Sequence, residues 1–191
     1  LRAAAAAGDA GDALAQLGQG RVLCAHREGP HGVGAWTARI EGWLAAAIDG
    51  YGAGSPWYVG RPLIVTRNDY ELALYNGDTG VVCARGGGAV AAVFERRGQL
   101  AELSPSRLGA AETVHAMTVH KAQGAQFSSV VLVLPGAGSA VLTRQLLYTA
   151  VTRARRQVTI VGPEASVRAA VGRPIARASG LAERLWRQPP A

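Results

Sequence analysis

The stretch Ala116-Met-Thr-Val-His-Lys-Ala-Gln-Gly-Ala-Gln-Phe127 decides the fold of this chain, because it joins two short apolar runs. Around it the sequence predicts strands and helices in alternation. The predicted elements are a strand at Val114 to Val119, a turn or short helix at Lys121 to Gln126, a strand at Val130 to Leu134, a helix at Thr143 to Arg155 and a strand at Val158 to Val161. Such alternation implies an α/β fold, with a parallel sheet and helices on its faces.

The first part of the chain shows the same pattern. It predicts a short helix at Asp9 to Gly18, a buried strand at Arg21 to Ala25, and an amphipathic helix at Val33 to Ile48 with Trp36, Ile40, Leu44 and Ala47 at helical spacing. A Gly/Ser/Pro-rich break at Gly50 to Pro56 predicts a linker.

Between these two parts the period changes to that of short strands. The predicted strands are Pro62 to Thr66, Gly80 to Ala84, Ala89 to Glu95 and Gln99 to Leu103, with a tight turn at Tyr75-Asn-Gly-Asp78. Several short strands at near-regular spacing suggest a small β-barrel. We therefore expect one α/β domain made of residues 1–59 and 108–191, with an inserted barrel at 60–107.

Polar groups gather where the central strand stops. Thr118, His120 and Lys121 would project a hydroxyl, an imidazole and an ammonium from the edge of the sheet, where open α/β sheets bind ligands. Such donors suit the phosphate oxygens of a nucleic-acid backbone. Gln123 and Gly124 would then let the chain approach a ligand through its backbone. An ordinary solvated turn accounts for any one of these residues, but less well for the whole string.

A second string, Leu146-Leu-Tyr-Thr-Ala-Val-Thr-Arg-Ala-Arg-Arg156, predicts a helix with two faces. The first face, formed by Leu147, Ala150, Val151 and Ala154, would point to the core, and the second, formed by Thr149, Arg153 and Arg156, would point away. An arginine on a rigid helix can neutralise charge on a transferring phosphoryl group. A solvated basic helix face is the commoner reading of such a string taken alone.

Composition limits the function classes. No apolar run is long enough to cross a membrane, and the two cysteines, Cys24 and Cys83, indicate a reducing compartment, for which we expect the cytoplasm. No group of residues has the spacing of metal ligands, so no metal site is expected. Residues 140–191 hold nine arginines against two glutamates, which suits a polyanionic partner, although a GC-rich genome explains arginine enrichment equally well.

The single lysine excludes a P-loop. A P-loop places a lysine after a glycine-rich turn, whereas Lys121 is preceded by Val119 and His120. The chain therefore has no nucleotide-binding core of its own. Because its first residue is Leu1, we expect a processed chain or a piece of a longer protein.

Together the two strings closely resemble motifs V and VI of superfamily 1 helicases, especially the RecD family, the alpha subunits of exodeoxyribonuclease V. Weaker similarities extend this resemblance over nearly the whole chain: Arg21 to Val33 is similar to motif IV, Gly60 to Asp69 with Leu74 to Gly80 to the entry of an SH3-like insertion, and Ala178 to Leu181 to the family's C-terminal end. The resemblance implies a RecA-like second motor domain with an inserted SH3-like β-barrel.

The resemblance also implies roles for individual residues. Single-stranded DNA would contact Thr118, His120 and Lys121. The shared ATP cleft would include Arg27, Gln123, Gly124, Gln126 and Arg153, with Arg153 as the catalytic arginine finger. Many relatives carry Glu where Gln126 stands, a position associated with the nucleotide ribose. An amide can still accept that hydrogen bond.

The implied function is ATP-dependent DNA unwinding in double-strand break repair and recombination, with 5′-to-3′ travel. ATP and Mg²⁺ would be held mainly by a separate N-terminal RecA-like domain, so the fragment alone would be inactive, and the RecB and RecC subunits would be partners. Two alternatives remain open. The helicase region of a conjugative relaxase carries similar strings, and a non-catalytic nucleic-acid-binding module would give Arg153 no special role.

Overall fold

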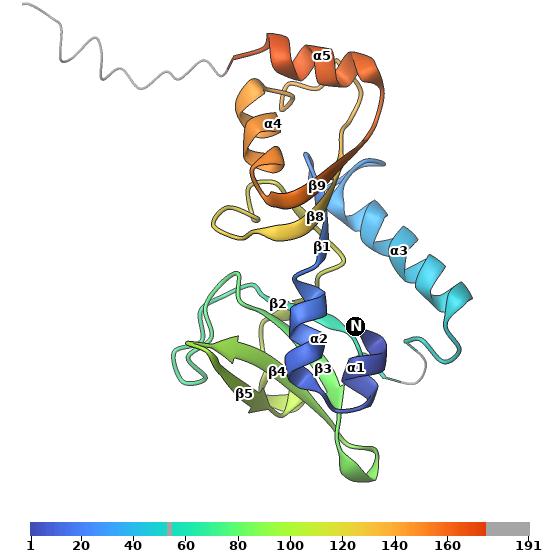
Figure 1. The fold of residues 1–191 in the computed structure, drawn as a ribbon, viewed down its shortest axis with the longest axis vertical. Helices are drawn as coiled ribbons and strands as arrows, with labels where there is room; N and C mark the ends of the chain where they lie inside the picture. Colours follow the sequence, from blue (N-terminus) through green and yellow to red (C-terminus); the bar gives the residue numbers. More distant parts are fainter. Residues whose placement is uncertain (53–54, 175–191) are drawn as a thin grey trace, which may run out of the picture.

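Two β-sheets, one parallel and one antiparallel, organise the chain (Figure 1). The structure is a computed structural model that describes residues 1–52 and 55–174. In Figure 1 the parallel sheet and helices α4 and α5 form the upper part, and the antiparallel sheet with α1 and α2 forms the lower part. The predicted similarity at Ala178 to Leu181 and the end of the basic stretch lie outside the described residues.

The helices are α1 (Arg2–Ala6), α2 (Ala10–Leu17), α3 (Val33–Ala47), α4 (Arg144–Val151) and α5 (Glu164–Gly172). The parallel strands are β1 (Gly20–Cys24), β7 (Ala116–Thr118), β8 (Phe127–Val133) and β9 (Ala154–Val161). The antiparallel strands are β2 (Pro62–Val65), β3 (Thr79–Ala84), β4 (Val90–Arg96), β5 (Gln99–Leu103) and β6 (Ala111–Thr113), with short 3₁₀ turns η1 (Gly86–Gly88) and η2 (Pro105–Arg107). No described helix is long and apolar enough to cross a membrane.

The parallel sheet confirms the predicted α/β fold. Its strand order is β7-β1-β8-β9, and every neighbouring pair is parallel. On one face the fully buried Leu23 and Leu132 belong to the same core as Leu146 and Ala150 of α4. Trp36 of α3 packs against a second, smaller cluster of buried strand residues that includes Cys24 and Val133. Apolar strands buried in this way are typical of parallel sheets that connect through helices.

The antiparallel sheet contains the predicted short strands in the order β5-β4-β3-β2-β6. No pairing among the described residues joins β5 to β6, so the SH3-like barrel stays a prediction. Small alanines of α1 and α2 pack on this sheet, against Val81, Cys83 and Val93. Helices α1 and α2 and strand β6 (residues 111–113) were expected in the α/β domain, yet they pack on or pair with the antiparallel sheet. The domain boundaries at 59/60 and 107/108 also stay a prediction.

Helix α4 is shorter than predicted. It ends at Val151 rather than Arg155, because the chain turns there and enters β9, where the Phe127 N–H donates to the Arg153 carbonyl at 2.8 Å. Parallel pairing with β8 therefore overrides the helical periodicity after Val151, so Arg153 and Arg156 do not lie on a helix face with Thr149. Three of the four predicted core residues, Leu147, Ala150 and Ala154, do belong to or pack against the main core, whereas Val151 is 41% exposed.

Helix α3 forms as predicted but buries less than an amphipathic helix should. None of its residues is fully buried, and Trp43 is 60% exposed. Val33 and Trp36 pack on the parallel sheet, and Trp36 meets Trp43 edge-to-face with ring centroids 6.2 Å apart. The expected apolar stripe is thus only partly used within the described residues.

A polar cluster lies where the two sheets meet. The Tyr51 hydroxyl is 2.9 Å from both the Tyr58 hydroxyl and the Nε2 atom of His115, a residue between β6 and β7. Burial, followed by repulsion from Arg21 and Arg61, lowers the pKa of His115 from 6.5 to about 4. The imidazole is therefore neutral in the folded protein at neutral pH.

We predict that His115 makes the fold acid-sensitive. Because the unfolded chain binds a proton at higher pH than the folded chain, this residue's contribution to stability is present above about pH 6.5 and is lost as pH falls towards about 4. In His115→Gln, the unfolding free energy measured with urea should fall less steeply over this window. His31→Gln, at an exposed position, is the control. An unchanged slope in His115→Gln would contradict the assignment.

Candidate functional site

The turn after β7 carries the first group of predicted site residues. The Thr118 Oγ1 atom accepts a hydrogen bond from the Lys121 N–H at 3.1 Å, and the Thr118 carbonyl accepts from the Ala122 N–H. Ala122 is fully buried and fixes the turn, whereas His120 and Lys121 are exposed. The Thr118 hydroxyl uses its oxygen in this turn and keeps its hydrogen for an outside acceptor.

A groove of about 340 Å³ runs beside edge strand β7. Its walls come from the turn after β7, from the segment after β1 and from the antiparallel sheet: Arg27, Val33, Ile64, Thr66, Asn76, Glu112, Thr113, Val114, Ala116, Met117, Thr118 and Lys121. The groove unites Thr118 and Lys121 with Arg27, and it leaves out His120. Its cations and hydroxyls suit a phosphate backbone.

Sequence reasoning missed one wall of this groove. Thr66 and Asn76 belong to the antiparallel sheet and its connecting turn, and they face the groove only because β6 leads directly into β7. No local pattern marks them, since Asn76 reads as an ordinary turn residue before Gly77. The Asn76 side-chain amide adds uncharged donors to the groove, whereas the Thr66 hydroxyl donates to the Ala110 carbonyl at 3.1 Å and offers only its oxygen.

The second group of site residues surrounds Arg153, directly before β9. Its Nε donates to the Thr149 carbonyl at 3.2 Å, its Nη1 to the Ala125 carbonyl at 3.1 Å and its Nη2 to the Thr152 Oγ1 at 3.2 Å. The half-buried guanidinium is thus tied to the end of α4 and, through Ala125, to the turn before β8. A guanidinium has five N–H donors, so two remain for a ligand. Arg153 thus lies beyond the end of the predicted helix, although Thr149 of that helix accepts one of its hydrogen bonds.

Arg155 and Gln126 make a second tie between the same two segments. The Arg155 Nε donates to the Gln126 Oε1 at 3.2 Å. The amide oxygen expected to meet a ribose therefore already accepts one hydrogen bond, although a carbonyl oxygen has a second lone pair. Arg155 was not among the predicted site residues. Arg156, also predicted to share the helix face of Arg153, lies exposed within β9.

The two groups lie at opposite ends of the parallel strands. Thr118 is level with Cys24 and Val133, whereas Phe127, next to Gln126, is six residues earlier in β8. At the usual rise per residue this separates the groups by about 20 Å along the strand direction. The segment Val119–Gln126 bridges that distance.

The other predicted site residues distribute between these ends. Gln123 and Gly124 are exposed in the bridging segment, and Gly124 has φ +88°, a left-handed conformation that favours glycine. Arg27 lines the groove with Thr118 and is not among the contacts of Arg153. Its predicted place in an ATP cleft stays a prediction. The described residues contain no cluster of three metal-binding side chains.

Comparison with known proteins shows which family the sequence resembles. Residues 113–161 match the family described as UvrD-like helicase C-terminal domain. Over 97% of its length the chain is 54% identical to the RecBCD enzyme subunit RecD of Mycobacterium tuberculosis (strain H37Rv), and it is 50% identical to that of Mycolicibacterium smegmatis. By sequence, the chain belongs with RecD proteins. It spans about a third of these relatives (32% of each) and matches their C-terminal part.

More distant comparisons agree. The ATP-dependent RecD2 DNA helicase of Deinococcus radiodurans is 31% identical over 86% of this chain and is matched over 23% of its own length. A crystal structure of the Pif1 helicase from Bacteroides, in complex with ADP-AlF3 and ssDNA, aligns with 92% of this chain and 49% of its own, with a TM-score of 0.51 and 16% identity. At that identity the likeness concerns the fold alone.

We predict that the Thr118 hydroxyl orders the turn that carries Lys121. Thr118→Val keeps the side-chain shape but removes the acceptor of the Lys121 N–H, so this amide should exchange with solvent faster. The unfolding free energy should fall by about 0.5–1.5 kcal/mol. Amide hydrogen exchange measured by NMR tests this, with Thr159→Val on an exposed strand position as control. Equal exchange at Lys121 in Thr118→Val and the unmodified chain would refute the role.

Proposed function

We propose that this chain is the second motor domain of a RecD-type ATP-dependent DNA helicase. In this proposal Thr118 and Lys121 contact a single DNA strand in the groove beside β7, and Arg153 acts on ATP held by another domain. One observation carries the proposal: a single segment, Val119–Gln126, connects the groove to the residues that hold Arg153. The family match, the α/β fold and the lack of a P-loop support it.

The surroundings of Arg153 fit phosphate better than metal. Gln126, Arg153 and Arg155 offer N–H donors and an amide oxygen, but no carboxylate. Mg²⁺ prefers carboxylate and water oxygens, so in this proposal the metal and most of the nucleotide are held by the domain that carries the P-loop. The present acceptors of Arg153 are neutral oxygens, and a charged phosphate oxygen accepts stronger hydrogen bonds. The guanidinium would therefore exchange an internal partner for the phosphate.

That exchange supplies a mechanism of coupling. When Arg153 no longer donates to the Ala125 carbonyl, the end of the bridging segment loses one of the hydrogen bonds that connect it to the segment before β9. Gly124 lies directly before Ala125 and can absorb the change in backbone angle. The movement would reach Lys121 through the turn closed by Thr118. The strand in the groove would thus be gripped and released as nucleotide is bound and hydrolysed.

The wider setting follows from the RecD relatives and is part of the proposal. It comprises assembly with RecB and RecC, 5′-to-3′ travel, and an SH3-like role for the antiparallel sheet in guiding strands. The relaxase alternative is less well supported, because the sequence match to RecD covers 97% of the chain. A non-catalytic nucleic-acid module remains the alternative of a different class, and the experiment below separates it from a motor.

We predict that Arg153 and Lys121 have separable effects in the longer protein that includes the P-loop domain. Arg153→Ala should lower the rate of DNA-stimulated ATP hydrolysis by about a thousandfold or more and leave single-strand affinity unchanged. Lys121→Ala should weaken binding of oligo-dT and reduce the slope of log affinity against log salt by about 0.7, because one phosphate contact is lost.

Arg156→Ala is the matched control, since Arg156 is exposed on β9 three residues after Arg153. It should retain both activities. A non-catalytic binding module predicts that no variant changes ATP hydrolysis, because no hydrolysis occurs. Full hydrolysis in Arg153→Ala would exclude the arginine-finger role, and unchanged DNA binding in Lys121→Ala would exclude the groove as the strand site.

A further inference from the structure

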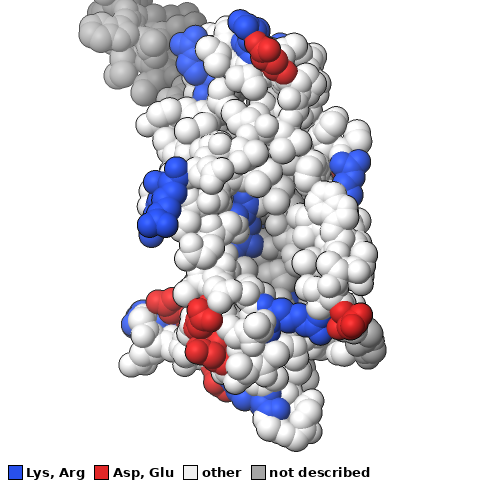
Figure 2. All heavy atoms as spheres, turned by 45° about the vertical axis from the view of Figure 1, so that its right-hand side comes forward, with Lys and Arg blue, Asp and Glu red and all other residues white. Residues whose placement is uncertain are grey.

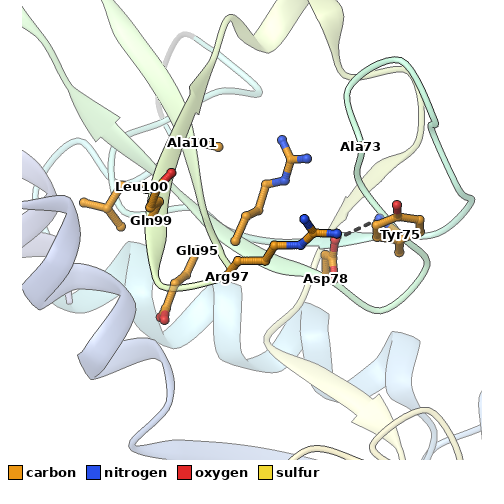
Figure 3. Close-up of a pocket in the computed structure, with 9 residues that line it drawn as sticks. Ala73, Tyr75, Asp78, Glu95, Arg97, Gln99, Leu100 and Ala101 are labelled. Atoms are coloured by element: carbon orange, nitrogen blue, oxygen red, sulfur yellow. Dashed lines mark hydrogen bonds between the residues drawn. The ribbon is translucent and has the colours of Figure 1, made fainter.

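A hollow of about 530 Å³ opens on the antiparallel sheet, away from the residues proposed for DNA and ATP. One wall is the β4–β5 hairpin, and the other is the segment that connects β2 to β3 (Figure 3). The lining residues are Ala73, Tyr75, Asp78, Glu95, Arg96, Arg97, Gln99, Leu100 and Ala101. Figure 3 shows the Arg97 side chain extending across the hollow towards Asp78 and Tyr75.

Backbone strain concentrates in this hollow. Only two described residues other than glycine have positive φ, Ala73 at +46° and Arg97 at +50°, and both line it. Arg97 and Gly98 form the two-residue loop of the hairpin, in which both positions have positive φ. Asn, Asp or Gly fits the first position of such a loop best, and another residue there costs about 1 kcal/mol. Strain of this kind accumulates at functional sites.

The hollow contains two arginines that form no ion pair, Arg96 and Arg97, together with two carboxylates, Asp78 and Glu95. The ion pairs formed in the described ranges are Arg85–Glu102 and Arg168–Glu164, so Arg96 and Arg97 have no carboxylate within ion-pair distance. The nearby Asp78 carboxylate instead accepts a hydrogen bond from the Tyr75 N–H at 2.8 Å. Two guanidinium groups therefore remain available to a ligand with carboxylate or phosphate oxygens.

An unpaired strand edge borders the same hollow. Strand β5 is the outermost strand of the sheet and pairs with β4 alone among the described strands. Alternate residues of an edge strand leave their N–H and C=O groups free for another strand. Three residues of β5, Gln99–Ala101, line the hollow, and Leu100 is 50% exposed. A peptide that enters the hollow thus finds backbone partners along one wall.

Exposed aromatic rings extend the opposite wall. Tyr75, which lines the hollow, is 49% exposed, and it meets the 77% exposed Tyr70 edge-to-face with ring centroids 6.4 Å apart. Tyrosine and arginine are the residue types that carry most of the binding energy in protein interfaces. Their concentration around a free strand edge indicates a surface for protein recognition.

The charge of the sheet favours a peptide over a nucleic acid. Residues 62–113 contain five arginines and six acidic residues. Figure 2 shows acidic and basic side chains mixed over the lower part of the molecule. Nucleic-acid affinity depends on an excess of positive charge along a surface, which this sheet lacks. Arg96 and Arg97 are neighbours at one end of the strand edge, so they offer positive charge to one carboxylate of a peptide rather than a continuous basic track for a phosphate backbone.

We propose that this hollow is a docking site for an extended acidic peptide segment of a partner protein. The segment adds as a strand to the free edge of β5, places a carboxylate between Arg96 and Arg97, and packs an apolar side chain on Leu100 and Tyr75. Main-chain pairing supplies affinity and the side-chain contacts supply selectivity, as in other complexes formed by strand addition. The site is independent of the proposed motor function.

Three fluorescent probes test the proposal on the 191-residue chain: a peptide of about ten residues that alternates Glu with Val, its Lys-Val counterpart, and oligo-dT. The acidic peptide should bind, and the Lys-Val peptide should not. The double change Arg96→Gln with Arg97→Asn should weaken acidic-peptide binding by about tenfold or more. Because Asn suits the hairpin loop better than Arg, the variant should fold at least as well.

Arg107→Gln is the control, because Arg107 is exposed in η2, the turn after β5, outside the hollow, and its loss should leave binding unchanged. NMR hydrogen exchange adds a second readout: the acidic peptide should slow exchange of β5 amides, including Leu100. Three outcomes would overturn the proposal: no acidic-peptide binding, equal loss in Arg107→Gln, or binding without protection of β5. Oligo-dT affinity that falls in the double variant would assign the hollow to nucleic acid instead.

Discussion

The buried guanidinium of Arg21 is the interaction on which the joint between the two sheets depends. Arg21 is 6% exposed, donates to the carbonyls of Val114 and Leu17 at 2.6 and 3.4 Å, and lies 5.1 Å from the Phe127 ring centre. Burial lowers the pKa of Arg21 to about 10, so the group remains charged at neutral pH. Its contacts fix the end of α2, the entry to β7 and the start of β8, directly after the bridging segment.

Much of the fold could be predicted because many of its strands and helices are indicated by local sequence patterns. Short apolar runs became β1 and β8, and the helix predicted from Asp9 formed as α2, with the Asp9 side chain accepting from the Asp12 N–H as its N-cap. The end of α4 could not be predicted, since helical spacing continues to Arg155 and only pairing with β8 ends the helix. The position of α1 and α2 on the antiparallel sheet was also hidden, because alanine-rich helices carry no signal of their partner.

The candidate site divides in the same way. Thr118 and Lys121 could be singled out from sequence because they stand where an apolar strand ends, and they line one groove, which does not include His120. The hydrogen bond from Arg153 to the Ala125 carbonyl forms because the turn before β9 lies next to the turn before β8, and sequence periodicity does not show such a contact. The hollow beside β5 was similarly invisible, because backbone strain at Ala73 has no sequence mark. Local chemistry is thus readable from residues, whereas the pairing of distant turns is not.

The central claim is that the segment Val119–Gln126 couples a DNA groove to a nucleotide-sensing arginine. The most direct test compares oligo-dT affinity with and without ADP-aluminium fluoride in the longer protein, for the natural sequence and for Gly124→Ala. Nothing lies within 4 Å of the added methyl group, so this change alters only the backbone preference at φ +88°. We predict that the nucleotide changes affinity in the natural protein and that Gly124→Ala greatly reduces this difference. An equal nucleotide effect in both proteins would contradict the account.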